Sequence, residues 1–195
     1  MAKGRTASMN WDDPRAVRTL TLLQDSFVEL IARKPFHLIS VREITDGAGV
    51  HYSTFFRRFK TKEDLLEFIV IEEVGNLLAV GSKASETSGT LGGARAMFRY
   101  VAGKADLWHA LLTSGAKNAV RMELARLSRE IGEERKPTND WIPVDLAVPL
   151  LTGGTIEVLT WWLTQPERPD IELAVNLFED LVTGPIMTRR PSPVG

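Results

Sequence analysis

The chain has 195 residues, of which 44% are hydrophobic and 25% are charged, and its formal net charge is −1. This composition fits a soluble globular protein with a substantial core. The near-zero charge excludes a chain that binds nucleic acid through a general excess of positive charge. The absence of cysteine excludes disulfides, thiolate zinc sites and cysteine nucleophiles. The N-terminus lacks the apolar core of a secretory signal and no apolar run approaches about 18 residues, so we expect a cytoplasmic protein without a membrane span.

The first predicted elements are an arm and a helix. Residues 1–12 are mostly small, polar and basic, which predicts a disordered arm. Asp13 and Pro14 suit the N-cap and first position of a helix. Apolar residues at helical spacing continue this helix to Lys34, because Pro35 cannot extend it.

Two capping signals organise the next stretch. Ser40 and Glu43 form a capping box that opens a second helix. Gly47 and Gly49 then predict a turn, and a third helix is expected over 52–59. A second capping signal, from Thr61 to Asp64, opens a long helix over about 65–80. Residues 13–62 therefore predict a helix-turn-helix head, and residues 63–80 a connecting helix.

The charge of this head is locally positive. No Asp or Glu occurs between Asp46 and Glu63, whereas four cations fall there: Arg57, Arg58, Lys60 and Lys62. A compact helix-turn-helix with such a cluster fits the groove of duplex DNA. The alternative is an ordinary pair of core helices with a solvated basic rim, which the expected exposure of Tyr52 and Phe56 disfavours.

The candidate DNA contacts lie on the second and third predicted helices and at the start of the fourth. Hydroxyl, imidazole and aromatic groups at the start of the third helix suit base edges or phosphates, and the cations suit phosphates. Lys62, beside free N–H groups of the next helix, is expected to clamp a phosphate. The full set is Ser40, Arg42, His51, Tyr52, Ser53, Thr54, Phe56, Arg57, Arg58 and Lys62.

The segment from about Leu23 to Leu66 resembles the DNA-binding domain of TetR-family transcriptional regulators. The motifs that carry the resemblance are Ser40-Val41-Arg42-Glu43-Ile44, Ala48-Gly49-Val50, Thr54-Phe55-Phe56-Arg57-Arg58-Phe59 and Thr61-Lys62-Glu63-Asp64-Leu65. The chain departs from the family pattern at Phe56, where a phosphate-binding Tyr is usual, and at Pro35, where Gly is usual. The resemblance implies a dimer that places two recognition helices in successive major grooves of a pseudo-palindromic operator. It also implies a C-terminal helical domain that binds a small-molecule effector.

The rest of the chain reads as helical. A Gly/Ser/Thr-rich loop is predicted over 81–93, followed by helices near 91–103, 105–114 and 116–133. A second loop, 136–143, precedes helices near 144–164 and 169–183. No strand-like alternation of useful length occurs. The predicted fold is all-α, with the N-terminal three-helix head and a C-terminal helical domain over 91–188 for ligand binding and dimerisation.

The last two predicted helices carry apolar stripes that suit a four-helix dimer interface. The mid-helix Gly153-Gly154 pair favours close helix contact. The candidate interface residues are Leu150, Gly154, Val158, Trp161, Ile171, Val175, Phe178 and Leu181. The alternative is that these residues fill the core of a single protomer.

An effector pocket is expected among the middle helices, where aromatic and Met side chains suit an apolar ligand. The candidates are Met97, Phe98, Tyr100, Trp108, Met122 and Trp141, each with ordinary core packing as its alternative. The three histidines are scattered, without metal-ligand spacing, and no phosphate loop or nucleophile elbow occurs. No metal, cofactor or catalytic residue is therefore expected.

The sequence thus predicts a dimeric DNA-binding regulator, most simply a repressor, that an unknown small molecule controls. The alternative is a helical ligand-binding or adaptor protein whose helix-turn-helix contacts another protein.

Overall fold

The computed structural model describes residues 14–134 and 141–187, and its contacts divide the chain into two compact units, Met1–Leu65 and Leu66–Gly195. The described residues form helices and no strand, which confirms the all-α prediction. The expected arm, 1–12, and the proposed N-cap Asp13 lie outside the described residues.

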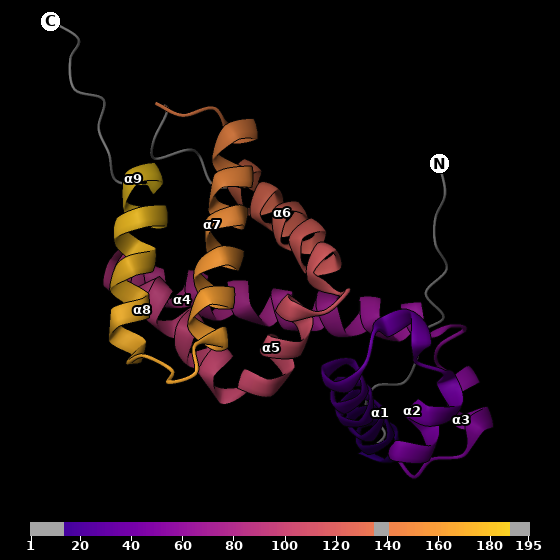
Figure 1. Cartoon of the computed structure of the whole chain (residues 1–195). Helices are drawn as coiled ribbons and strands as arrows, with labels where there is room; N and C mark the ends of the chain where they lie inside the picture. The colour runs from indigo at the N-terminus through magenta and orange to yellow at the C-terminus, as the bar shows by residue number, and fades with distance from the viewer. Residues whose placement is uncertain (1–13, 135–140, 188–195) are drawn as a thin grey trace, which may run out of the picture. The chain divides into compact units, whose positions relative to one another are not determined.

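The first unit contains a three-helix head (Figure 1). It consists of α1 (Pro14–Arg33), the short 3-10 turn η1 (Phe36–Leu38), α2 (Val41–Gly47), α3 (Tyr52–Phe56) and the first turn of α4 (Lys62–Gly103). Helix α3 is shorter than the predicted 52–59. The core of the head consists of side chains that are fully buried: Leu23, Phe27, Ile44, Phe55 and Leu65.

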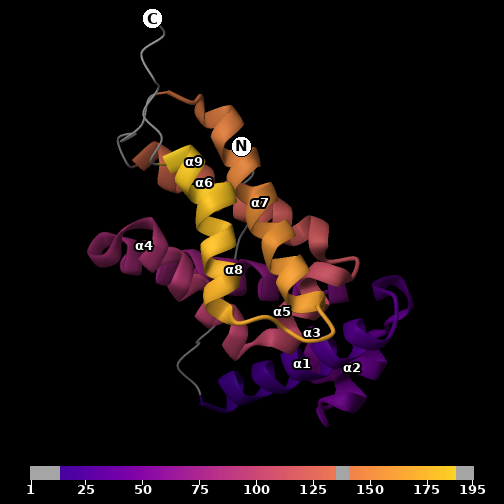
Figure 2. The same cartoon turned by 60° about the vertical axis from the view of Figure 1, so that its left-hand side comes forward.

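The second unit is built on the rest of α4. It continues with α5 (Ala105–Thr113), α6 (Lys117–Glu134), α7 (Val144–Thr164), α8 (Ile171–Phe178), the π-helical turn η2 (Glu179–Thr183) and α9 (Gly184–Met187). Helix α7 packs against α5, α6 and α8, and α7 and α8 lie side by side in both views (Figures 1 and 2). The Phe98 ring lies 5.6 Å from the rings of both Trp162 and Phe178, so α4, α7 and α8 share one aromatic core.

The loop predicted over 81–93 is wrong, because these residues are helical. Helix α4 instead has two limbs, 62–88 and 90–103, which meet at Gly89, whose φ of 67° only glycine adopts readily. The limbs pack so closely that a Cβ on Gly93 would lie 2.0 Å from Ser85 Oγ, and one on Gly81 would lie 2.7 Å from Met97 Cγ. The small residues that suggested a loop are therefore what lets two helices approach each other.

Helix α7 differs from the sequence expectation in one respect. By length and composition alone it could cross a membrane, whereas no such segment was expected. Its buried residues, however, contact the neighbouring helices of the same unit. Glu157, near its middle, also pairs with Lys117 of α6 at 3.0 Å. These contacts are those of a core helix with one outward side.

Candidate nucleic-acid interface and effector cavity

Helix α2 is positioned by a complete capping box. The Ser40 hydroxyl accepts a hydrogen bond from the Glu43 backbone N–H at 3.3 Å, and the Glu43 carboxylate accepts from the Ser40 backbone N–H at 2.9 Å. Lys34, at the end of α1, also pairs with Glu43. Because of the Lys34 ammonium, and then the Ser40 N–H and hydroxyl, the pKa of Glu43 falls from 4.5 to about 2. Ser40 was expected to contact DNA. In the structure its hydroxyl and N–H are used to cap α2.

The lowered pKa predicts how the stability of the head depends on pH. A carboxyl whose folded pKa lies below its unfolded pKa stabilises the fold above the unfolded value, and this contribution is lost as pH falls through the folded value. The destabilisation caused by Glu43→Gln should therefore be full above about pH 5 and should shrink as the pH is lowered towards about 2. Urea unfolding of both proteins across this range measures the difference, and a difference that does not depend on pH would contradict the assignment.

The turn between α2 and α3 has a glycine where the backbone requires one. Gly49 has φ of 62°, and the Val50 N–H donates to the Thr45 carbonyl at 3.0 Å. The buried Ser26 hydroxyl of α1 donates to the Ile44 carbonyl at 2.9 Å. These bonds fix the angle at which α3 leaves α2, as a helix-turn-helix requires.

Helix α3 buries one side and exposes the other. Phe55 is fully buried against Phe59, with ring centroids 5.6 Å apart. On the outer side, Tyr52 and Phe56 are 50% and 45% exposed, and their rings meet edge to face at 5.0 Å. A solvent-facing aromatic pair on a helix this short indicates a surface that meets a partner.

The start of α3 is shaped by His51. Its Nδ1 accepts from the Ser53 N–H at 3.3 Å and lies 2.8 Å from Ser53 Oγ. His51 is therefore the N-cap of the helix and holds the Ser53 hydroxyl in place. Both side chains are exposed, whereas Thr54 is only half-exposed. The polar residues predicted for base and phosphate contacts thus share the leading turn of α3.

The cations of the head are unequally available. Arg42, Arg57 and Lys60 are exposed and Arg58 is half-buried. None of these four side chains forms an ion pair with a residue that the structure describes. They are free for an external anion.

Lys62 has another role from the one that the sequence suggested. Its ammonium donates to the carbonyls of Phe36, His37 and Ile39 at 2.9, 3.3 and 2.7 Å. It also lies 4.7 Å from the centroid of the Phe36 ring. All three of its donors are thus used within the head, so Lys62 fixes the segment between α1 and α2 and the geometry does not favour the expected phosphate clamp.

Replacing Lys62 by Met should therefore destabilise the head without removing a direct phosphate contact. Three carbonyls would lose a charged donor, at a cost of about 2–3 kcal/mol in the free energy of unfolding. Amide hydrogen exchange of α1 and α2 measures the loss, and Lys60→Met is the control because the Lys60 side chain is exposed. A normal head stability, with a reduced salt dependence of DNA binding, would restore the phosphate role.

Comparison with known proteins supports this reading of the head. Residues 25–69 match the family model of bacterial regulatory proteins, tetR family, over the segment that holds α2, α3 and both capping signals. The head of the chain therefore carries the sequence pattern of the tetR family.

Similar proteins extend the resemblance beyond the head. The chain is 26% identical over 180 residues to the fatty acid metabolism regulator protein of Bacillus subtilis, covering 82% of this chain and 92% of the relative. The solved structure of Bacillus halodurans FadR, a fatty acid degradation regulator, matches with a TM-score of 0.66 at 22% identity over 88% of this chain and 97% of that one. Bacillus subtilis FadR in complex with stearoyl-CoA matches with a TM-score of 0.64 at 23% identity over 84% and 98%. Both units therefore have the fold of such regulators.

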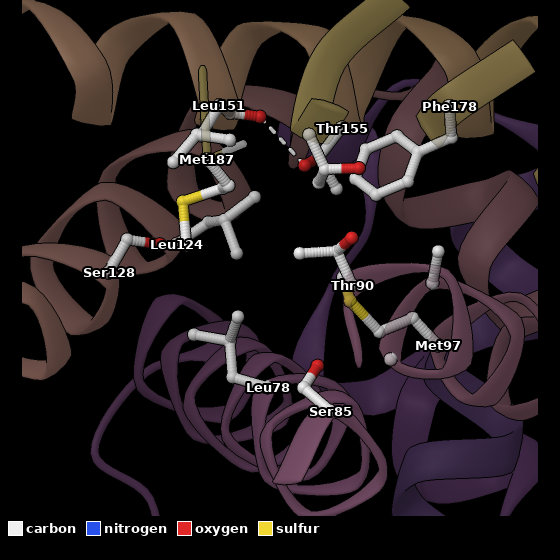
Figure 3. A pocket seen from close by; sticks show the side chains of 13 residues that line it. Leu78, Ser85, Thr90, Met97, Leu124, Ser128, Leu151, Thr155, Phe178 and Met187 are labelled. Atoms are coloured by element: carbon white, nitrogen blue, oxygen red, sulfur yellow. Dashed lines mark hydrogen bonds between the residues drawn. The ribbon is translucent and has the colours of Figure 1, made fainter. Parts of the chain in front are cut away.

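The second unit holds a cavity of about 160 Å³ between α4, α6, α7 and the α8–α9 segment. Apolar side chains from all of these helices line it, with several hydroxyls among them (Figure 3). Of the predicted pocket residues, Met97 lines this cavity. Leu78, Ser85 and Thr90 line it too; they were not predicted, and Ser85 and Thr90 fall in the segment that was expected to be a loop. Small residues at 81, 85, 88 and 92, at helical spacing, were the signal that could have identified them.

The other five predicted pocket residues do not line this cavity. Phe98 and Trp108 are fully buried core residues, and Met122 is 65% exposed. Tyr100 donates to the buried Glu73 carboxylate at 2.9 Å, and Trp141 donates to the Ile186 carbonyl at 3.2 Å. Aromatic character alone did not separate residues that line the cavity from those that pack in the core.

The predicted dimer residues divide into two groups. Val175 and Phe178 are core residues of a single protomer. A Cβ on Gly154 would lie 2.6 Å from the methyl groups of Val182, so its close contact is also internal. Leu150, Trp161 and Leu181 are exposed, and Val158 and Ile171 are half-exposed. With Leu146 and Leu173, which are also exposed, these apolar side chains make up the outer face of α7 and α8, which includes Leu181 of the adjoining turn η2.

Proposed function

We propose that the chain is a dimeric transcriptional repressor that binds a pseudo-palindromic operator and is controlled by a small molecule. The observation that carries this proposal is the outer side of α3. It combines an exposed aromatic pair and polar residues with arginines that have no ion-pair partner in the described part of the chain. No acidic residue occurs over 47–62. Such a surface suits phosphates at its edges and base edges at the leading turn of the helix.

A second copy of the chain is the partner that suits the outer face of α7 and α8. An exposed apolar face on two adjacent helices favours burial against another protein, and the same face on a second copy would complete a four-helix bundle. Two-fold symmetry also provides the two heads that half-sites about 34–36 Å apart require. The cytoplasm is the proposed location, because the duplex is there.

Helix α4 provides the route by which an effector would act. Its first limb begins at Lys62, which is bonded to the head, and continues to Leu78 and Ser85, which line the cavity. A ligand that widens the cavity would move this limb and shift the population of DNA-competent dimers. Ligand pockets usually enclose about 300–1,000 Å³, so a large effector such as the stearoyl-CoA bound to the relative would need the walls to separate.

A gel shift with the DNA that flanks the protein's own gene tests the proposal. We expect a complex of two protomers on one duplex that survives competition by shuffled DNA of the same composition. Absence of any preferred fragment, with the chain folded and binding a protein partner instead, would favour the adaptor alternative.

A further inference from the structure

Four of the hydroxyl groups that line the cavity donate their protons to acceptors of the protein itself. Ser85 donates to the Gly81 carbonyl at 2.9 Å, and Thr155 donates to the Leu151 carbonyl at 2.7 Å (Figure 3). Thr90 and Thr183 both donate to the carboxylate of Glu179, one to each oxygen. Four lining hydroxyls therefore use their single proton within the chain.

A hydroxyl that has donated its proton can only accept. It keeps two lone pairs, so the cavity offers a ligand acceptors at four positions. Turning a hydroxyl of Thr90 or Thr183 towards a ligand would break a bond to a charged acceptor, and such bonds are roughly twice as strong as neutral ones. Ser128 is the one lining hydroxyl without a hydrogen-bond partner among the described residues.

The negative charge of the Glu179 carboxylate, which accepts two of these hydrogen bonds, also favours a proton-donating or cationic ligand. Glu179 opens the π-helical turn and is half-buried, and none of the described Lys or Arg side chains pairs with it. The residues that line the cavity include no cation. A positive or proton-donating group beside Thr90 and Thr183 would therefore be attracted, whereas a carboxylate would meet acceptors and a negative charge.

We propose that the cavity recognises a small apolar molecule that carries an ammonium group at the Thr90–Thr183 end. This inference rests on the proposed effector role of the cavity and names the chemical class of its ligand. The cavity volume limits the apolar part of this molecule to about one ring, because a cavity of roughly 150 Å³ holds one benzene ring. The polar end of the proposed ligand is thus cationic, whereas the polar end of a fatty acid is anionic.

Three probes that differ in one group test this class. Benzylamine, benzyl alcohol and benzoate share a ring and differ in being cationic, neutral and anionic at pH 7. Each is titrated into the full-length protein in the absence of DNA, and the methyl signals of Met97 and Met187, which line the cavity, report binding by NMR. We expect benzylamine to bind at least about tenfold more tightly than benzoate, with benzyl alcohol between them. Equal or tighter binding of benzoate, or no shift of either methyl with any probe, would overturn the proposal.

A matched pair of variants assigns the selectivity to Glu179. Glu179→Gln keeps the shape of the side chain and removes its charge, and it should weaken benzylamine binding by about tenfold while leaving benzyl alcohol within about twofold. Asp180→Asn removes a charge from the next, exposed residue and should change neither. If both variants weaken benzylamine equally, general surface charge is the cause and the proposal fails.

The two proposals fail in different experiments. Loss of the benzylamine preference would remove the ligand class and leave DNA recognition intact. Failure of the gel shift would remove the repressor role, whereas selective amine binding in the cavity would still be measured without DNA.

Discussion

Replacing Arg57 and Arg58 together by Gln should weaken operator binding by roughly 100-fold at physiological salt, because a dimer loses four phosphate contacts. The slope of log K against log salt should fall in magnitude by about 3–4, at about 0.9 per phosphate. The loss should be similar for specific and shuffled duplexes, since phosphate contacts carry no sequence information. Fluorescence anisotropy at several salt concentrations measures both quantities.

The matched control changes the same charge elsewhere. Arg99 and Arg129 lie in the second unit and are exposed, so Arg99→Gln with Arg129→Gln should leave both affinity and slope close to those of the wild type. If both double variants behave alike, overall charge and not the surface around α3 governs binding.

Leu181→Glu should convert the dimer to a monomer and abolish operator binding. Leu181 is 68% exposed in the protomer, so the substitution leaves the fold of one chain intact. In the proposed interface, two symmetry-related carboxylates would be buried without partners, which costs several kcal/mol. We expect the dimer to weaken, with its dissociation constant raised by more than about 100-fold as measured by light scattering, and the two-protomer complex to be lost in the gel shift.

Met122→Glu is the control for this prediction. Met122 is 65% exposed on α6 and is not among the residues of the outer face of α7 and α8, so its charge should not change the oligomeric state. A Leu181→Glu protein that remains dimeric would place the interface elsewhere.

Local signals in the sequence predicted the head well. Ser40 and Glu43 cap a helix, Pro35 ends one because it lacks an N–H, and Gly49 allows a positive φ. Each of these effects acts within a few residues. Such features need no tertiary contact to be interpreted, which is why α1, α2 and the turn before α3 were correctly expected. The second capping signal was also correct, since the Asp64 N–H donates to Thr61 Oγ1 at 3.1 Å.

Features that depend on distant contacts were not predictable. The role of Lys62 depends on carbonyls 23 to 26 residues away, and no local pattern shows that its ammonium is already engaged. Glycine and serine over 81–93 have loop-like propensity, yet close packing of the two α4 limbs outweighs it. The α8–η2 segment likewise has a buried Val175 and an exposed Leu181. Which of its sides meets α7 decides this, because its apolar residues suit either a core or an interface.

The salt dependence of duplex binding by the unmodified protein tests most directly whether the outer side of α3 docks on DNA. With the DNA that flanks its gene, we expect log K to fall linearly with log salt, with a slope of about −4 or steeper for two protomers that each neutralise two or more phosphates. A slope near zero, or no affinity for any duplex at low salt with and without small molecules, would contradict the proposed function.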